Sequence, residues 1–269
     1  MAAYISAQRS YLPLINPNLE HAFPDLTFIE LTHHPNLVSL DHISHSFGDQ
    51  KVLDDISINL KKEYITAILG KSGSGKSTIL QMINGMIRPD HGQVKLNGTL
   101  LDYKNIHSQR LQIGYVVQQV GLFPHMSVGE NIRLLGKIAK KPATDIDKRV
   151  KVLMDMVQLP ISHLDKYPYQ LSGGEQQRAG LCRAMLLQPP LLLMDEPFAS
   201  LDHATKQGIY KHLLEIQQKE SRTVVLVTHD WEEAIRLADA FVWIAEGKIK
   251  ATGDKAMLVE MKNVYQASL

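Results

Sequence analysis

The stretch GKSGSGKST occupies residues 70–78, directly after the apolar run EYITAIL and before a helix-favouring segment that reads STILQMING. It contains the complete pattern G-x-x-x-x-G-K-[ST], and its flanks predict the strand and the helix that this pattern requires. Gly70, Gly73 and Gly75 allow the backbone to fold tightly, so that successive N–H groups point at phosphate oxygens. The stretch therefore predicts a phosphate-binding loop between a strand and a helix.

The side chains of this loop have separate expected roles. Lys76 supplies a positive charge between the β- and γ-phosphates of a nucleotide, and the Ser77 hydroxyl is placed to bind Mg²⁺. Lys71 either adds charge near the phosphates or is a solvated loop lysine, and the sequence leaves both readings open. A glycine-rich turn without a ligand is the alternative for the whole stretch, but the lysine and both flanks argue against it. The expected nucleotide-binding residues of the loop are Gly70, Lys71, Ser72, Gly73, Ser74, Gly75, Lys76, Ser77 and Thr78.

Two adjacent acids end the apolar run PLLLMDE, residues 190–196. The run does not alternate between polar and apolar residues, which is typical of a central parallel strand covered on both faces. Neighbours along a strand point to opposite faces, so the two acids can have different roles. We expect Asp195 to hold Mg²⁺ and Glu196 to orient and polarise the attacking water. The alternative, a solvated acidic loop, would leave two charges beside a phosphate loop for no gain.

A second run without alternation, TVVLVTH at residues 223–229, ends in His229. A lone histidine is most often structural, but the layer of strand ends that it shares with Glu196 favours a role in the site. From there His229 can donate a hydrogen bond to the γ-phosphate and hold the catalytic water in line.

The glycine-rich stretch LSGGEQQR occupies residues 171–178. Ser172 followed three residues later by Glu175 fits a capping box, which predicts a helix that begins here with open backbone N–H groups. A helix start with glycines in front of it can hold an anion. The alternative is that Ser172 only caps its helix and that Gly173 and Gly174 form a loop.

Composition limits the classes of function. The 269 residues are 44% hydrophobic and 21% charged, which is enough to bury a substantial core. Lys and Arg number 29 against 28 Asp and Glu, so no basic field attracts nucleic acid. One cysteine, Cys182, cannot form an intrachain disulfide and suits the reducing cytosol. We find neither an apolar run of about 18 residues nor a signal-peptide pattern.

The pattern of residues divides the chain into parts. Residues 1–36 are punctuated by prolines and only weakly periodic, so we expect an irregular N-terminal extension there. Short strand-like runs separated by turn residues follow. We expect one domain at residues 37–262, with a helical insertion at about residues 120–188, and a tail at residues 263–269.

In this order the motifs resemble those of the ATPase subunits of ATP-binding cassette (ABC) transporters, over about residues 38–260. The resemblance adds Phe47 as the aromatic residue that stacks on adenine, Gln118 of IGYVVQQ as a catalytic and Mg²⁺-binding glutamine, and Asp202 of SLD as a residue that couples two sites. It implies an α/β fold: a P-loop NTPase core with a mostly parallel sheet, an antiparallel β subdomain and an inserted helical subdomain. It also implies ATP and Mg²⁺ as cofactors, with Lys76 among the catalytic groups.

The resemblance further implies that two copies join head to tail as a homodimer. Ser172, Gly173, Gly174 and Glu175 of one chain would then contact the γ-phosphate of ATP held by the other. Glu175 stands where glutamine is frequent in the family, which removes no catalytic group. ATP binding would close the pair and hydrolysis would loosen it.

The sequence further resembles the ATPase subunits of bacterial importers. It implies transmembrane permease subunits as partners, a solute-binding protein indirectly, no nucleic acid, and a peripheral position at the cytoplasmic face of the inner or plasma membrane. The wording of the segment QQVGLFPHMSV, residues 118–128, is similar to that of the ATPase subunits of importers of osmoprotectants such as glycine betaine, choline or proline. Amino-acid import, an exporter ATPase subunit and a soluble ABC ATPase are the alternatives.

Overall fold

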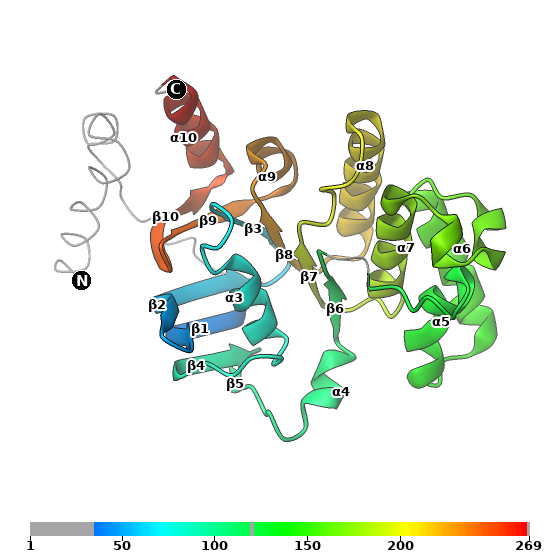
Figure 1. Cartoon of the computed structure of the whole chain (residues 1–269), viewed down its shortest axis with the longest axis horizontal. Coiled ribbons are helices and arrows are strands. Elements are labelled where there is room, and N and C mark those ends of the chain that lie inside the picture. The colour runs from blue at the N-terminus through cyan, green and yellow to red at the C-terminus, as the bar shows by residue number, and fades with distance from the viewer. Residues whose placement is uncertain (1–34, 119–120, 268–269) are drawn as a thin grey trace.

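The computed structural model describes residues 35–118 and 121–267 (Figure 1). The expected N-terminal extension at residues 1–36 therefore lies outside the described residues, apart from its last two. The expected tail at residues 263–269 begins inside the last helix, α10 (Lys255–Ala267). In the part of the chain that the structure describes, no helix combines the length and the apolar character needed to cross a bilayer.

A six-stranded sheet forms the centre of the molecule, with the strand order β10-β9-β3-β8-β7-β6. Strands β9, β3, β8, β7 and β6 are parallel, and only β10 pairs in the antiparallel direction. The mostly parallel sheet expected from the sequence is thus confirmed. Its strands are β3 (Ile65–Leu69), β6 (Ile113–Val116), β7 (Leu191–Asp195), β8 (Thr223–Thr228), β9 (Ala240–Ala245) and β10 (Lys248–Asp254).

The runs without alternation form strands that are buried along their whole length. In β7, Leu192 and Met194 belong to one hydrophobic cluster, whereas Leu191 and Leu193 belong to another on the opposite face. Because neighbouring side chains of a strand point to opposite faces, both faces of the sheet must be covered by apolar residues. This double coverage explains why the sequence of the strand shows no period of two.

A four-stranded antiparallel sheet covers one side of the core, in the order β2-β1-β4-β5 (Figure 1). Its apolar face shares a cluster with helix α3 (Lys76–Ile83) and with one face of the large sheet. The antiparallel β subdomain is therefore confirmed. Its strands are β1 (Asn36–Phe47), β2 (Gln50–Lys61), β4 (His91–Leu96) and β5 (Thr99–Leu100).

Helices between β6 and β7 form a separate lobe beside β6 (Figure 1). Within the described residues these are α5 (Val128–Ile138), α6 (Ala143–Met156) and α7 (Gly173–Met185), with short 3-10 turns η2 (Ile161–Asp165) and η3 (Pro168–Gln170). All lie within the span expected to be a helical insertion. The remaining described helices are α4 (Ile106–Arg110), α8 (His203–Lys219) and α9 (Trp231–Leu237).

An ionic cluster joins the helical lobe to the end of α8. Arg149 of α6 donates from Nη1 and Nη2 to the two carboxylate oxygens of Glu220, at 2.5 and 2.9 Å. Arg222 donates to the same carboxylate and is only 3% exposed. Paired bonds from a guanidinium fix geometry as well as charge. The cluster of Arg149, Glu220 and Arg222 therefore forms a clasp between the lobe and the α/β core.

Candidate functional site

The loop between β3 and α3 holds the Lys76 ammonium group inside its own curve. Lys76 Nζ donates to the carbonyl oxygens of Gly70 and Lys71, at 2.8 and 2.7 Å. Burial lowers the pKa of Lys76, and the negative charges of Glu196 and Asp195 oppose this shift. The loop thus presents a buried positive charge next to two carboxylates, at the position where the motif binds phosphate.

Glycines of this loop are required by packing and by backbone conformation. Gly73 and Gly75 have φ angles of +78° and +99°, which side-chain-bearing residues rarely adopt. A Cβ atom on Gly75 would lie 2.5 Å from Leu53 Cδ2, and one on Gly70 would lie 2.2 Å from the carbonyl oxygen of Ile244. The remaining expected residues differ in exposure: Lys71 and Ser72 are exposed, whereas Ser74 and Thr78 are buried.

Ser77 and Asp195 meet where α3 begins and β7 ends. The Ser77 hydroxyl donates to Asp195 Oδ1 at 3.0 Å. Burial raises the pKa of Asp195, and the Ser77 hydrogen bond and the Lys76 charge offset that shift only in part. A hydroxyl and a carboxylate side by side are the kind of oxygen ligands that Mg²⁺ prefers. The pair therefore fits a magnesium ion whose other ligands come from phosphates and water.

The Glu196 carboxylate lies between two other expected site residues. Gln118 Nε2 donates to Glu196 Oε2 at 3.4 Å, and His229 Nδ1 lies 3.2 Å from Glu196 Oε1. The three residues follow β6, β7 and β8, which are adjacent parallel strands. Their side chains meet because the carboxyl ends of parallel strands share one edge of the sheet, where open α/β sheets bind ligands.

The backbone at Glu196 is held by a residue that the sequence did not reveal. Glu196 has φ +45°, an uncommon conformation that costs energy unless the surroundings fix it. Its N–H donates to the carbonyl oxygen of Val227 at 2.9 Å, and its carbonyl accepts from Gln177 Nε2 at 3.0 Å. Gln177 lies in the quoted stretch LSGGEQQR, but nothing in the spacing of that stretch points to Glu196.

Helix α7 begins with the capping box that the sequence predicts. Ser172 Oγ accepts the Glu175 N–H at 3.3 Å, and Glu175 Oε2 accepts the Ser172 N–H at 2.8 Å. The N–H and the hydroxyl of Ser172 both donate to Glu175 Oε2 at 2.8 Å, and these two bonds, together with His163 Nε2 at 3.0 Å from Glu175 Oε1, lower the pKa of Glu175 to about 2. The contact with His163 of η2 was not expected.

The two glycines at the start of α7 differ in their surroundings. A Cβ atom on Gly174 would lie 3.1 Å from Leu201 Cδ2, so close packing within the chain explains this glycine. A Cβ atom on Gly173 would meet no atom within 4 Å. Gly173 also has no positive φ. Among the described residues, nothing accounts for the missing side chain at Gly173, and there is open space in front of the helix.

Phe47 and Asp202 lie in different settings. Phe47 ends β1 and lies nearly perpendicular to the His45 ring with centroids 4.8 Å apart, and its 52% exposure leaves ring surface available for stacking. Asp202 caps α8 by accepting from the N–H and the hydroxyl of Thr205, at 3.0 and 2.6 Å. Within one chain, capping is a sufficient reason for Asp202.

A phosphate loop that faces two adjacent acids at the end of one strand of a mostly parallel sheet defines a P-loop nucleoside triphosphatase. The family model described as "ABC transporter" matches residues 53–199. The chain belongs to the ABC transporter family, as the ATP-binding cassette of such a transporter.

Three similar proteins show which members of the family this chain resembles. The glycine betaine uptake system ATP-binding protein YehX of Escherichia coli (strain K12) is 38% identical over 218 residues, which cover 81% of this chain and 71% of that protein. The glycine betaine/carnitine/choline transport ATP-binding protein OpuCA of Bacillus subtilis (strain 168) is also 38% identical over 218 residues, with 81% and 57% covered. The chain thus spans little more than half the length of the Bacillus protein. In the solved dimeric structure of MJ0796, a bacterial ABC transporter cassette, the match has a TM-score of 0.76 at 29% identity and covers 81% of this chain and 98% of that one.

Proposed function

We propose that the chain is the ATP-hydrolysing subunit of a membrane importer that takes up an osmoprotectant such as glycine betaine or choline. The observation that carries the proposal is the Glu196 carboxylate, which lies between Gln118 and His229 beside the phosphate loop. The names of the relatives support uptake as the direction and osmoprotectants as the cargo class.

ATP would bind along the loop from Gly70 to Thr78, with its adenine on the exposed face of Phe47. Lys76 would exchange its carbonyl partners for β- and γ-phosphate oxygens. Those two partners are main-chain groups of the loop itself. The ammonium group is therefore already positioned, and binding requires only the replacement of hydrogen bonds.

The residues that would hold Mg²⁺ are Ser77 and Asp195, with the side-chain oxygen of Gln118 as a third ligand. When bound, Mg²⁺ neutralises negative charge on the β- and γ-phosphates. The Ser77 hydroxyl and the Asp195 carboxylate already lie side by side, so little rearrangement is needed.

Hydrolysis would use Glu196 to orient and polarise the attacking water. His229, whose side chain is 64% exposed, can reach a γ-phosphate and hold the water in line. Because the contact of Glu196 with Gln118 is long, at 3.4 Å, a water can replace it without loss of a strong hydrogen bond.

The ATP-hydrolysing unit would be a head-to-tail homodimer. The start of α7 offers unpaired N–H groups and the positive end of the helix, which together favour a phosphate. Gly173 leaves space there that none of the described residues of its own chain fills. A γ-phosphate held by the partner chain would fit this space, with Asp202 near the junction between the two sites.

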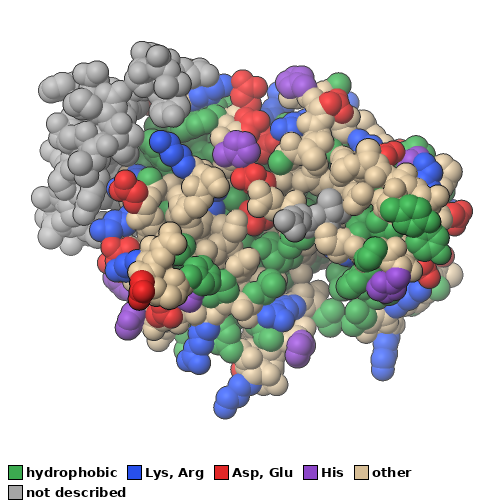
Figure 2. Space-filling model, in the orientation of Figure 1, with side chains coloured by type: hydrophobic (Ala, Val, Ile, Leu, Met, Phe, Trp, Pro, Cys, Tyr) green, Lys and Arg blue, Asp and Glu red, His purple; other side chains and the backbone are tan. Residues whose placement is uncertain are grey.

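Transmembrane permease subunits would bind the chain at the cytoplasmic face of the inner or plasma membrane, with a solute-binding protein acting indirectly. The segment after Gln118 supplies an exposed Phe123 for that contact. The fully buried Asn131 holds this segment: its Oδ1 accepts the Phe123 N–H at 2.7 Å, and its Nδ2 donates to the carbonyl of Phe123 at 3.1 Å. Figure 2 also shows hydrophobic side chains exposed over the helical lobe.

Uptake by cells that lack this gene tests the cargo. We expect such cells to lose uptake of radiolabelled glycine betaine or choline at high salt, and to regain it with the wild-type chain but not with Glu196→Gln. Uptake of sulfate and of amino acids serves as the control. Loss of amino-acid uptake with normal osmoprotectant uptake would overturn the proposed cargo.

A second measurement tests whether the chain is a transporter subunit or a soluble ABC ATPase. The tagged chain, purified from membranes in mild detergent, should carry permease subunits with it. Copurification with ribosomes or DNA in their place would contradict the transporter assignment.

A further inference from the structure

Gln177 joins three segments of the site through one buried side chain. Its Nε2 donates to the carbonyl oxygen of Glu196 at 3.0 Å, and its Oε1 accepts the N–H of Ser200 at 3.2 Å as well as the Ser200 hydroxyl. Gln177 is 4% exposed. Both ends of the amide are therefore used, and they connect α7 to the end of β7 and to the segment that leads to Asp202.

The bond to Glu196 acts on a backbone that β7 alone does not fix. Glu196 follows the last residue of β7, and its φ of +45° turns the chain away from the strand direction. Val227 holds the N–H of Glu196, whereas Gln177 holds its carbonyl. Removing the Gln177 amide would release one side of a strained peptide, so the direction of the Glu196 carboxylate depends on Gln177.

The same helix presents its first turn to the space in front of Gly173. Gln177 lies one turn after Gly173, so both move with the start of α7. Gly174 packs closely on Ser200 and Leu201: its Cβ position lies 3.3 Å from the Ser200 carbonyl oxygen and 3.1 Å from Leu201 Cδ2. A displacement of the helix start therefore acts directly on the segment that Gln177 also holds.

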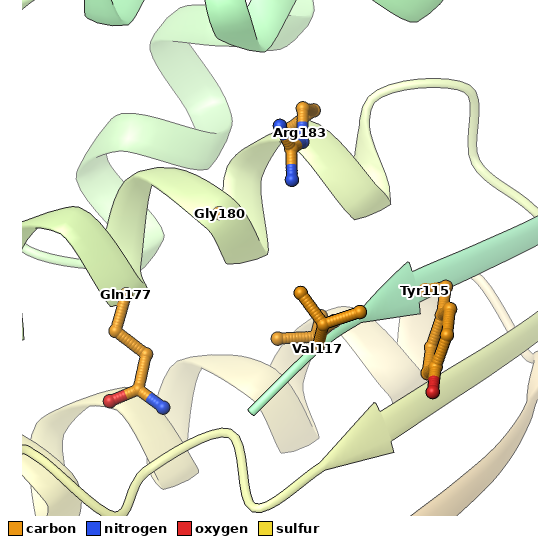
Figure 3. Close-up of a pocket in the computed structure, with 6 residues that line it drawn as sticks. Tyr115, Val117, Gln177, Gly180 and Arg183 are labelled. Carbon is orange, nitrogen blue, oxygen red and sulfur yellow. The ribbon is translucent and has the colours of Figure 1, made fainter. Parts of the chain in front are cut away.

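The Gln177 side chain also borders a small recess beneath α7. The recess lies between α7 and β6, lined by Tyr115, Val116, Val117, Gln177, Gly180 and Arg183 (Figure 3). In Figure 3 the Gln177 side chain extends from α7 to the same side as Val117, which directly precedes Gln118. At this point α7 is thus attached to the end of β7 by the hydrogen bonds of Gln177, with a recess between the helix and β6.

We propose that Gln177 is a positioning residue that couples the two ATP sites of the dimer. The start of α7 contacts ATP on the partner chain. When α7 moves, the hydrogen bonds of Gln177 move the Glu196 backbone and Ser200 of its own chain with it. Glu196 then reaches its working orientation only when the partner's site is occupied. The inference rests on the head-to-tail dimer of the proposed function.

Three variants test the coupling. Gln177→Met keeps the length of the side chain but removes both polar ends, whereas Gln177→Glu keeps an acceptor for Ser200 and loses the donor to Glu196. Gln176→Met is the matched control, because the Gln176 side-chain amide donates to the backbone carbonyl of Leu171, at 3.2 Å, and to no other described residue. The readouts are kcat, the Hill coefficient for ATP, the Kd for a fluorescent ATP analogue, and ATP-driven dimer formation in the Glu196→Gln background.

We expect both Gln177 variants to lower kcat about tenfold to a hundredfold, the range that a misplaced reacting group can cost. The Hill coefficient should fall towards one, while nucleotide Kd and dimer formation stay within about twofold of wild type, because α3 and the start of α7 are intact. Gln176→Met should behave as wild type. A purely structural role would instead weaken nucleotide binding and dimer formation together with kcat.

Other outcomes separate the two proposals. A wild-type chain without ATPase activity or ATP-driven dimers would overturn the proposed function. A cooperative wild-type ATPase whose kcat and Hill coefficient survive in both Gln177 variants would overturn only the coupling. If Gln177→Met fails to fold, Gln177→Glu decides alone: a folded variant with unchanged kcat contradicts the inference, and one with lowered kcat and unchanged Kd supports it.

Discussion

Glu196 illustrates how one residue can combine strain with order. Its φ of +45° is unfavourable, yet hydrogen bonds hold its N–H and its carbonyl, and each carboxylate oxygen has a neighbour, Gln118 or His229. These contacts give the Glu196 carboxylate a defined place within one chain, and in the coupling that we propose the start of α7 moves it into its working orientation through Gln177. The proposed general base is therefore positioned by contacts from neighbouring strand ends and from Gln177 of α7.

Glu196→Gln should abolish turnover while ATP binding is retained. The amide keeps the shape and most contacts of the side chain but cannot accept a proton, so kcat should fall at least about 10²-fold. ATP-bound dimers should accumulate and be visible by size-exclusion chromatography. Glu260→Gln, an exposed change on α10, is the control. Hydrolysis at the wild-type rate would refute the role of Glu196.

Lys76→Ala should weaken ATP binding, because the loop loses the buried charge that faces the phosphates. Hydrogen bonds to charged groups contribute about 1.5–3 kcal/mol, which corresponds to about tenfold to a hundredfold in Kd by calorimetry. Lys71→Ala provides the comparison, because the Lys71 side chain is exposed, whereas the Lys76 side chain is buried. An equal loss in both variants would mean that net charge near the phosphates matters more than the position of Lys76.

At the scale of elements, local patterns are predictable and long-range contacts are not. The capping box of α7 could be predicted because Ser172 and Glu175 lie within one turn, and the central strands because burial on both faces removes alternation. The partner of Gln177 and the contact of Glu175 with His163 could not be predicted, because they depend on how separate elements pack. Glu196 and His229 could be placed together because the ends of parallel strands share an edge.

Gly173→Asp should separate folding from dimer formation. In the described part of the chain no atom lies within 4 Å of a Cβ at Gly173, and a carboxylate in the first turn of a helix is favourable, so the monomer should be as stable as wild type or slightly more stable. The same carboxylate would repel a γ-phosphate of the partner, so ATP should no longer drive dimer formation in the Glu196→Gln background. Gly173→Ala tests size without charge. Dimers that form normally with Gly173→Asp would exclude a phosphate from this space.

The Glu175 carboxylate in the capping box of α7 should remain ionised at unusually low pH. Because the N–H and hydroxyl of Ser172 and then His163 bond to the carboxylate, the pKa of Glu175 is about 2. An unfolded glutamate titrates near its ordinary value, so this group stabilises the fold fully above that value and loses its contribution as the pH falls towards 2. NMR of the Glu175 side-chain carbon should show an ionised carboxylate at pH 3.5. A midpoint near 4.5 would contradict the geometry of the box.

At the scale of the molecule, a shared hydrophobic cluster and several side-chain hydrogen bonds or ion pairs join the helical lobe to the α/β core. The clasp of Arg149, Glu220 and Arg222 is one of them, and it lies far along the sequence from the phosphate loop. The resemblance to the family implies both the core and the inserted helical lobe, but nothing in the sequence points to the clasp. Two arginines and one glutamate at these spacings form no motif, and their meeting depends on the packing of α6 against the end of α8.

Glu220→Ala should lower the free energy of unfolding by about 2–3 kcal/mol, because it leaves two poorly solvated guanidinium groups without their shared counterion. Burial opposes ionisation of Glu220, yet the hydrogen bonds from Arg149 hold its pKa below the ordinary value, so the native fold contains the charged form. Urea unfolding at pH 7 measures the loss, and Glu215→Ala, exposed on α8, is the control. We expect Glu220→Gln to fall between the two, because it retains acceptor and donor atoms but no charge. If Glu220→Ala and Glu215→Ala unfold at the same urea concentration, the lobe is held to the core by its apolar packing and the clasp contributes nothing measurable.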